Sequence, residues 1–361
     1  MGPGPSDAHP RVLQAMARPL IGHLDPAFVA MMDEVKQMVQ QTMLTQNQLT
    51  FVVSAPGSAG METCLVNLLE PGDECIIAVN GVFGGRMVDI AQRCGAVVHR
   101  IDTEWGKVTE PEQLRKALDA CPRPKLVALV HAETSTGALQ PLEEISRMVH
   151  EADSLLVVDA VTSYCGVPLK VDEWGIDAIY SGSQKCLSAP PGLSPVSLSE
   201  RALKVLDNRK TKVQSWFLDL SMVKNYWAGA KRAYHHTGPV SAVFAIYEAL
   251  SLVLEEGLAA RWERHQAVHQ YLKRRLEEMG FRFLVEEAYR LPNLNAVYLP
   301  EGWDEAELRS RLLQEYNIEV GGGLGAFAGK IWRIGIMGES CTYNHVNMLA
   351  GALEKINPGK F

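Results

Sequence analysis

The chain has 361 residues, of which 47% are hydrophobic and 21% are charged. This composition is typical of a soluble globular protein and excludes disorder as the main state, and the length predicts two domains. The 35 lysines and arginines are outnumbered by 42 aspartates and glutamates, which gives a net charge of -7. A protein that wraps a polyanion usually has the opposite balance, so nucleic acid is excluded as the main partner.

The seven cysteines are scattered singly, and no Cys-x-x-Cys pair occurs. This pattern predicts reduced thiols rather than a disulfide framework, as in a cytosolic protein. The apolar runs are much shorter than the roughly 18 residues that a membrane span needs, and the first residues do not have the pattern of a secretory leader. We therefore expect a cytoplasmic protein that does not interact with a membrane.

The first 20 residues contain four prolines and little periodicity, so we expect residues 1–20 to form an extended N-terminal arm. After the arm, short apolar runs alternate with segments of helical spacing. The strand candidates are residues 51–53, 75–79, 96–98, 126–130, 155–158, 178–180 and 195–198, and helical segments cover residues 61–69, 87–94, 112–120 and 142–152. This βα alternation predicts a three-layer α/β/α large domain with a mainly parallel sheet over residues 21–257.

The pattern changes after a long helical segment at residues 241–258. The later strand candidates are residues 281–285, 295–299 and 332–336, and the later helices are residues 304–316 and 344–356. Strands and helices no longer alternate regularly here. The sequence therefore predicts a smaller C-terminal α+β domain over residues 258–361.

Polar residues that directly follow apolar strands are the first candidates for a site, because ligands of open α/β sheets bind at the carboxyl ends of the strands. Four segments have this position, residues 54–58, 131–137, 159–161 and 181–185. Asp159 ends one strand, and Lys185 follows 26 residues later in a Ser-x-Ser-x-Lys run. Taken alone, Asp159 is equally well explained as a helix N-cap, and Lys185 as an exposed lysine.

Together, this carboxylate and this lysine match the chemistry of pyridoxal 5'-phosphate (PLP). PLP needs an amine that bonds covalently to its aldehyde and a carboxylate that keeps its pyridine nitrogen protonated. Residues 56–60 lead from a strand into a helix, whose first N–H groups can bind a phosphate. Phe83 follows another strand end, where an aromatic ring can stack on a flat cofactor. For the loop and for Phe83, purely structural roles remain open on local sequence.

Beyond these residues, the sequence resembles the class V aminotransferases of PLP fold type I, in particular the alanine–glyoxylate and serine–pyruvate aminotransferases. The matching runs occur in order along almost the whole chain, at residues 2–6, 69–73, 80–84, 133–137, 156–159, 180–185, 189–192, 234–237, 321–325 and 333–335. The resemblance implies PLP as the cofactor and the fold-type I architecture.

The resemblance also implies roles around the cofactor. Lys185 would bind PLP covalently and Asp159 would hold its ring nitrogen, so these two residues are expected to be catalytic. Thr134 would place a hydroxyl near the 3'-oxygen of PLP, and Phe83 would stack on the ring. The phosphate would be held by residues of this chain together with two residues from the second subunit of a homodimer: Pro56, Gly57, Ser58 and Gln184, with Tyr234 and Thr237 from the partner.

For the substrate, the resemblance implies that Arg333 clamps the carboxylate and that Ser6 and Asp7 line the substrate end of the site. The predicted function is transfer of an amino group from alanine or serine to glyoxylate or pyruvate, in a homodimer with composite active sites. One alternative is a lyase related to the cysteine desulfurases, which would need a reactive cysteine such as Cys341. Another is a protein that binds PLP without turnover.

Histidine pairs are the remaining candidates for metal ligands. His265 and His269 are four residues apart on an expected helix, but Gln266 stands where a zinc-protease motif has Glu. We therefore expect both on a hydrated helix face. His235 and His236 are neighbours on an extended chain and point to opposite sides, which favours packing or hydrogen bonding. No metal site is expected.

Overall fold

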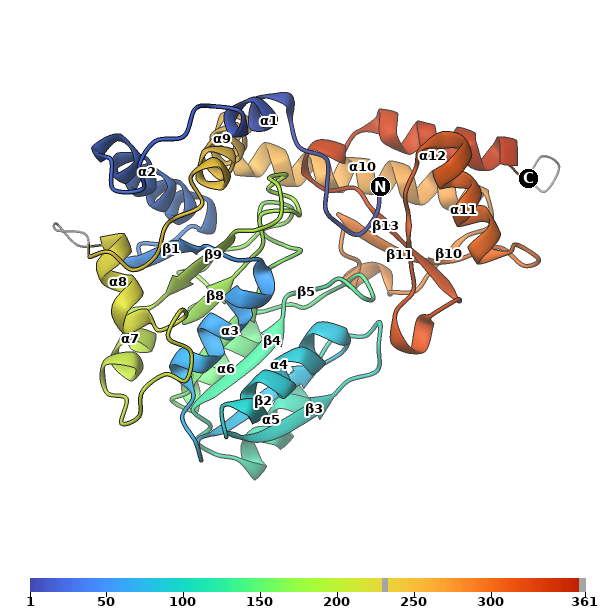
Figure 1. Cartoon of the computed structure of the whole chain (residues 1–361). Helices are drawn as coiled ribbons and strands as arrows, with labels where there is room; N and C mark the ends of the chain where they lie inside the picture. Colours follow the sequence, from blue (N-terminus) through green and yellow to red (C-terminus); the bar gives the residue numbers. More distant parts are fainter. Residues whose placement is uncertain (229–232, 357–361) are drawn as a thin grey trace.

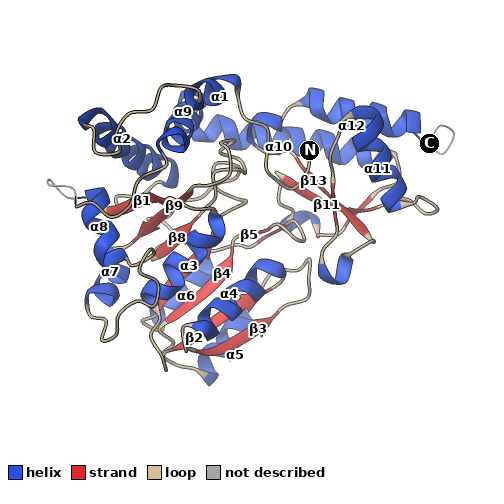
Figure 2. Cartoon of the chain, viewed as in Figure 1, coloured by secondary structure: helices blue, strands red, loops and turns tan. Residues whose placement is uncertain are grey.

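The computed structural model describes residues 1–228 and 233–356, and its largest element is a seven-stranded sheet (Figures 1 and 2). In spatial order the strands are β1 (Leu49–Val53), β9 (Ser194–Leu198), β8 (Ala178–Tyr180), β7 (Leu155–Asp159), β4 (Leu126–Val130), β2 (Glu74–Val79) and β3 (Val97–Asp102). β9 runs antiparallel to β1 and β8, and the other neighbouring strands are parallel. Each of the seven predicted strands is present, with ends shifted by a few residues.

Helices pack on both faces of this sheet (Figure 1). They are α2 (Pro26–Met43), α3 (Gly57–Leu68), α4 (Val82–Arg93), α5 (Pro111–Ala120), α6 (Glu143–Glu151), α7 (Glu200–Asp207) and α8 (Leu220–Ala228), and α9 (Val240–Glu256) packs against α2. β4 and β7 are buried along their whole length, as expected for parallel strands covered on two sides. The predicted three-layer α/β/α fold is therefore confirmed. Within residues 1–228 and 233–356, no helix combines the length and the apolar character needed to cross a membrane.

A four-stranded antiparallel sheet lies beside the large one (Figure 1). Its strands lie in the order β10 (Arg282–Phe283), β11 (Leu294–Tyr298), β13 (Ile331–Gly335) and β12 (Gly321–Gly322). Helices α10 (Leu258–Glu278), α11 (Glu305–Tyr316) and α12 (Tyr343–Ile356) accompany it. Its buried apolar side chains, among them the fully buried Trp332, form a cluster separate from the core of the large sheet. This agrees with the predicted α+β fold for this part of the chain.

The N-terminal arm is only partly extended, so this expectation needs a correction. Helix α1 (Pro10–Met16) begins at a proline in its first turn, and the side chain of His9 accepts a hydrogen bond from the Arg11 N–H. Val12 is fully buried, and the helix packs against α9. Proline is compatible with the first turn of a helix because its missing N–H would have no helical partner there. The prolines of the arm therefore do not exclude a helix.

His265 and His269 are buried in the structure, so the predicted hydrated face is wrong. The backbone N–H of Gly338 donates to Nε2 of His265 at 3.0 Å, and Nδ1 of His269 lies 2.7 Å from the Asn295 side-chain oxygen. Burial lowers the pKa of His265 to about 3 and that of His269 to about 4. Both rings are therefore neutral hydrogen-bonding groups of the interior, because β11 and the turn before α12 cover this face of α10.

Candidate active site

Lys185 and Asp159 lie at the carboxyl edge of the large sheet. Asp159 is the last residue of β7, and it is in register with Tyr180, the last residue of the parallel strand β8. Lys185 follows in the next loop, and the relative exposure is 9% for Lys185 and 2% for Asp159. Both side chains line one cleft of about 180 Å³, which is formed by Pro56, Gly57, Ser58, Met61, Phe83, Arg86, Asp159, Val161, Gln184 and Lys185. The structure thus brings together seven of the predicted site residues.

The Asp159 carboxylate is held from two sides. Its Oδ1 accepts a hydrogen bond from the Val161 N–H, and its Oδ2 accepts one from the Tyr180 hydroxyl, each at 2.8 Å. Burial raises the pKa of Asp159 to about 7, although both hydrogen bonds act in the opposite direction. The residues after Asp159 form a turn rather than a helix, so the helix N-cap interpretation does not apply.

Lys185 is covered by the N-terminal arm. Its Nζ donates a hydrogen bond to the Pro3 carbonyl, and a Cβ on Gly4 would lie 2.6 Å from Nζ. The Ser6 N–H and hydroxyl donate to the carbonyls of Gln184 and Lys185 at 2.8 and 2.6 Å. Burial, followed by the nearby Arg333 guanidinium, lowers the pKa of Lys185 to about 8. A lysine in this state is partly neutral at neutral pH, as a nucleophilic amine must be.

The predicted phosphate loop forms the first turn of α3, which begins at Gly57 rather than near Met61. Pro56 is the N-cap residue and supplies no side-chain cap, so the first N–H groups of the helix remain available. A Cβ on Gly57 would lie 3.1 Å from the Val161 side chain. The Gln184 Oε1 is buried and has no hydrogen-bond partner among the described residues. Backbone donors, a tight glycine and an unpaired amide therefore meet at one end of the cleft.

Two residues of this region were not predicted from the sequence, Glu133 and Arg86. Glu133 is fully buried and accepts hydrogen bonds from the Phe83 N–H at 3.3 Å and from the Ser135 hydroxyl at 2.6 Å. Burial raises its pKa. Arg86 lines the cleft from α4. The available signals were the strand-end position of Glu133 and the three-residue spacing of Arg86 from Phe83 on a helix.

Arg333 reaches the region from β13 of the second sheet. Its Nε donates to the Gly322 carbonyl at 2.8 Å and its Nη1 to the Thr134 carbonyl at 3.3 Å. Burial lowers its pKa, and the negative charge of Glu133 opposes this. The Thr134 hydroxyl is bonded to the Thr162 hydroxyl, so the contact of Thr134 with Arg333 is through its backbone.

The other predicted site residues are not among those that line the cleft. Ser6 is bonded to the lysine loop. Asp7 accepts a hydrogen bond from the Ser340 hydroxyl at 2.7 Å and lines a separate cavity of about 370 Å³. Tyr234 and Thr237 are exposed, with their hydroxyl oxygens 3.5 Å apart. Within a single chain, these four residues do not complete the cleft.

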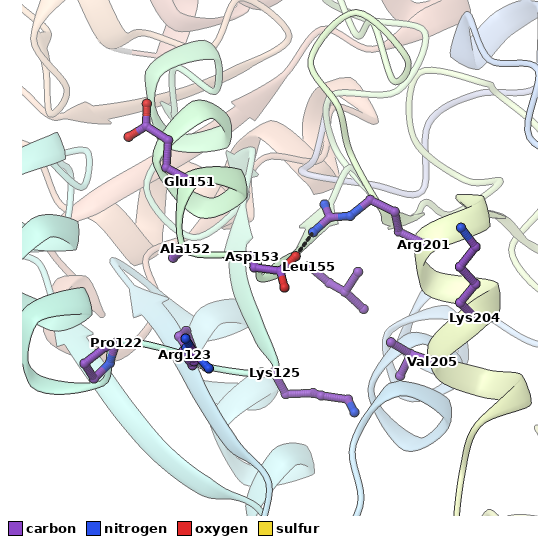
Figure 3. A pocket seen from close by; sticks show the side chains of 11 residues that line it. Pro122, Arg123, Lys125, Glu151, Ala152, Asp153, Leu155, Arg201, Lys204 and Val205 are labelled. Atoms are coloured by element: carbon purple, nitrogen blue, oxygen red, sulfur yellow. Dashed lines mark ion pairs between the residues drawn. The ribbon is translucent and has the colours of Figure 1, made fainter.

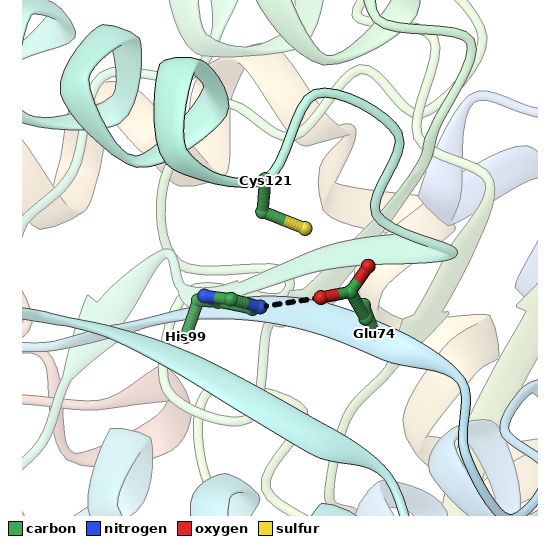
Figure 4. Close-up of side chains that lie close together, drawn as sticks. All are labelled: Glu74, His99 and Cys121. Atoms are coloured by element: carbon green, nitrogen blue, oxygen red, sulfur yellow. Dashed lines mark hydrogen bonds and ion pairs between the residues drawn. The ribbon is translucent and has the colours of Figure 1, made fainter.

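The opposite edge of the large sheet carries other polar groups. A cavity of about 660 Å³ opens at the amino ends of β4 and β7, where Arg201 lies 3.7 Å from Asp153 (Figure 3). Beside it in the sheet, the His99 ring lies 3.0 Å from the Glu74 carboxylate, next to the Cys121 thiol (Figure 4). Burial and the Glu74 charge raise the pKa of Cys121. We interpret this group as a hydrogen-bonded histidine–glutamate pair packed beside a thiol.

Comparison with known proteins assigns the family. The model of the family "Aminotransferase class-V" matches residues 8–333. An alanine–glyoxylate aminotransferase of Oryctolagus cuniculus is 42% identical over 98% of this chain and 91% of that protein. An (S)-ureidoglycine–glyoxylate transaminase of Bacillus subtilis is 37% identical over 99% of this chain and 89% of that protein.

A solved structure gives the same result. The crystal structure of an alanine–glyoxylate aminotransferase from Nostoc sp. has a TM-score of 0.96 and 50% identity, and the match covers 99% of this chain and 94% of that one. The shared fold, the extent of the sequence match and the buried lysine–aspartate pair agree with one another. The chain therefore belongs to the class-V aminotransferase family and is an aminotransferase.

Proposed function

We propose that this aminotransferase uses PLP to move an amino group from a small amino acid, alanine or serine, to glyoxylate or pyruvate. One observation carries the proposal: the nearly buried side chains of Lys185 and Asp159 line the same cleft at the carboxyl ends of adjacent strands. Glyoxylate as acceptor is supported by the names of the relatives, which include alanine–glyoxylate and ureidoglycine–glyoxylate aminotransferases.

The residues present fit PLP. The open first turn of α3 offers N–H donors for a phosphate, and the side-chain amide of Gln184, whose Oε1 is buried without a partner among the described residues, offers an NH₂ donor. Asp159 offers a carboxylate for the ring nitrogen, Phe83 an aromatic face, and Lys185 an amine for the aldehyde. When bound, PLP supplies an electron-poor ring that stabilises negative charge on the α-carbon of the substrate.

Lys185 performs the proton transfer. At neutral pH part of its amine is neutral, because the pKa is lowered to about 8. Nζ accepts the proton that leaves the α-carbon of the amino donor in the first half of the reaction, and it donates a proton to the α-carbon of the newly formed amino acid in the second half. Asp159 acts by charge. The Tyr180 hydroxyl and the Val161 N–H fix its carboxylate in place, where it would hold the protonated ring nitrogen of PLP by opposite charge.

Arg333 orients the substrate. Two of its donors are held by backbone carbonyls, so the guanidinium plane is fixed before substrate binds. A planar guanidinium matches a carboxylate with two parallel hydrogen bonds. Alanine, serine, glyoxylate and pyruvate all carry this carboxylate next to the reacting carbon. One arginine therefore serves both halves of the reaction.

The active unit is a homodimer. The exposed hydroxyl groups of Tyr234 and Thr237 lie close together but do not line the cleft of their own chain. This arrangement supports a role in the cleft of the second subunit, as the family resemblance implies. A two-fold dimer uses the same surface twice and would complete both sites.

The cysteine lyase alternative lacks support in the structure. Cys341 is fully buried, and burial raises its pKa to about 12. A reactive cysteine needs thiolate character and access to the substrate.

A matrix of amino donors and oxo-acid acceptors tests the proposed function. Alanine and serine should be among the best donors, and glyoxylate or pyruvate should be a better acceptor than 2-oxoglutarate. Transfer to 2-oxoglutarate alone would overturn the substrate assignment. Tight PLP binding without transfer to any acceptor would instead support a binding protein without turnover.

A further inference from the structure

The two arginines of α4 differ in their partners. Arg93, in the last turn, donates from Nε to the Asp89 carboxylate at 2.9 Å. Arg86, in the second turn, forms no ion pair with a carboxylate anywhere in residues 1–228 and 233–356. Its guanidinium carbon lies 5.0 Å from the centre of the Phe83 ring, and it lines the cleft that contains Lys185. Arg86 is thus a cation that faces the proposed cofactor site without a counter-charge.

Arg86 also contacts the first turn of the neighbouring helix α3. Its Nη1 donates a hydrogen bond to the Ser58 hydroxyl oxygen at 2.9 Å. An oxygen that accepts this bond keeps its own O–H as a donor. The Ser58 hydroxyl is therefore oriented to donate to a third group. The N–H groups at the start of α3 have the same donor character.

The cleft contains few positive charges that could bind a phosphate. Among the residues that line it, only Lys185 and Arg86 carry positive charge. In the proposed function Lys185 is used by the aldehyde of PLP, whereas the phosphate carries up to two negative charges near neutral pH. The N-terminus of α3 contributes only about half an elementary charge. A full positive charge beside this helix end is therefore needed to balance the negative charge of the phosphate.

We propose that Arg86 binds the phosphate of PLP and, through its hydrogen bond to Ser58, orients that hydroxyl as a second phosphate donor. The inference rests on the proposed function, because it assumes that PLP occupies this cleft. The competing explanation is that Arg86 only packs on the Phe83 ring, as a cation over an aromatic face. Only the first explanation predicts that Arg86 contributes more to the binding of PLP than to the binding of the same ring without its phosphate.

The test compares PLP with pyridoxal, which has the same ring and aldehyde but no phosphate. Cofactor-free protein is titrated with each compound, and binding is followed by the absorbance change of the ligand and by quenching of protein fluorescence. Arg86→Gln should weaken PLP binding about 10- to 100-fold, as expected for a lost charge-assisted hydrogen bond. Pyridoxal binding should change less than about 2-fold, and inorganic phosphate should compete less well with PLP than in the unaltered protein.

Arg93→Gln is the matched control, because it removes the same charge from the same helix outside the cleft. It should leave both dissociation constants unchanged. Arg86→Lys should recover part of the PLP affinity, since it keeps the charge but not the fork that reaches Ser58. If Arg86→Gln does not fold, as judged by circular dichroism, the binding of PLP and pyridoxal and the competition by inorganic phosphate are measured on Arg86→Lys instead.

Two results would overturn the inference alone. One is an equal loss of affinity for PLP and pyridoxal, which would indicate a role through Phe83 or the fold. The other is unchanged PLP affinity in Arg86→Gln. Failure of the proposed function has a different signature, namely that the unaltered protein binds PLP no better than pyridoxal, or binds neither.

Discussion

Ionisable side chains lie both at the carboxyl ends of the strands of the large sheet (the carboxyl edge) and at their amino ends (the amino edge), but the surroundings of these side chains differ. At the carboxyl edge, Lys185 and Asp159 are nearly buried, with pKa values of about 8 and about 7. At the amino edge, Arg123 and Lys204 are exposed, although the cavity there is about 660 Å³ against about 180 Å³ for the cleft. Burial of opposite charges, rather than the volume of the cavity, therefore distinguishes the site.

The largest effect is expected at Lys185. Lys185→Ala should lower kcat by roughly 10⁴-fold, because it removes both the covalent partner of PLP and the proton carrier. In the unaltered protein, borohydride reduction and peptide mapping should place the pyridoxyl group on the peptide that contains Lys185. A label on a different lysine would show that Lys185 is not the residue that binds PLP covalently.

The next largest effect is expected at Arg333. Losing a desolvated contact to the substrate carboxylate should reduce kcat/KM by about 30-fold to several thousand-fold. The absorbance of bound PLP should be unchanged, because this arginine contacts substrate and not cofactor. Arg333→Lys should recover little. Near-normal kcat/KM in Arg333→Ala for every donor would place the carboxylate clamp elsewhere.

Mixing two inactive variants tests whether the cleft is completed by a second subunit. Lys185→Ala protein and Tyr234→Ala/Thr237→Ala protein each lack one half of a composite site. After random subunit exchange, about half of the dimers are mixed and each has one intact site, so activity should return to roughly a quarter of the native level. If the subunits exchange and no activity returns, each active site is formed by one chain alone.

A smaller effect concerns pH. Burial makes the neutral amine of Lys185 available above a pKa of about 8, rather than near the ordinary lysine value. The rate at which cofactor-free protein captures PLP should therefore rise with pH, with a midpoint near 8. The Asp159 charge raises the pKa of Lys185, so Asp159→Asn should shift this midpoint downward. A midpoint near the value of free lysine would mean that the amine is not desolvated.

The smallest effect is expected at the amino edge. Arg123→Ala and Lys204→Ala should leave kcat/KM within about 2-fold and the melting temperature within about 2 °C of the unaltered protein, because both side chains are exposed. These variants are controls for every substitution at the carboxyl edge. A large loss of activity in either variant would indicate that the larger cavity takes part in the function of the protein.

Much of the site could be predicted from the sequence because it depends on strand ends. The rule that parallel strands end at one edge locates Asp159 and Lys185, and the register of β7 with β8 agrees with this. Arg86 could not be found in this way. It meets Ser58, 28 residues earlier, only because α3 and α4 pack against each other. Spacing within one element does not contain that contact.

The incorrect predictions have the same origin. The spacing of His265 and His269 indicates one face of a helix, but it does not show that β11 and the turn before α12 cover that face. The prolines of the arm predict an extended chain, although Pro10 begins a helix that packs against α9 and buries Val12. Local sequence predicts elements, and tertiary contacts decide their exposure.

The contacts of the N-terminal arm also determine the order in which the site can assemble during protein synthesis. The Met1 carbonyl accepts a hydrogen bond from the Gly335 N–H at 2.8 Å, and the Pro3 carbonyl accepts one from Lys185. The arm leaves the ribosome well before β13 is made. Until that strand emerges, the first residues lack their final partner and Arg333 is absent from the site. A nascent chain therefore acquires these contacts of the arm and of Arg333 only after β13 has emerged.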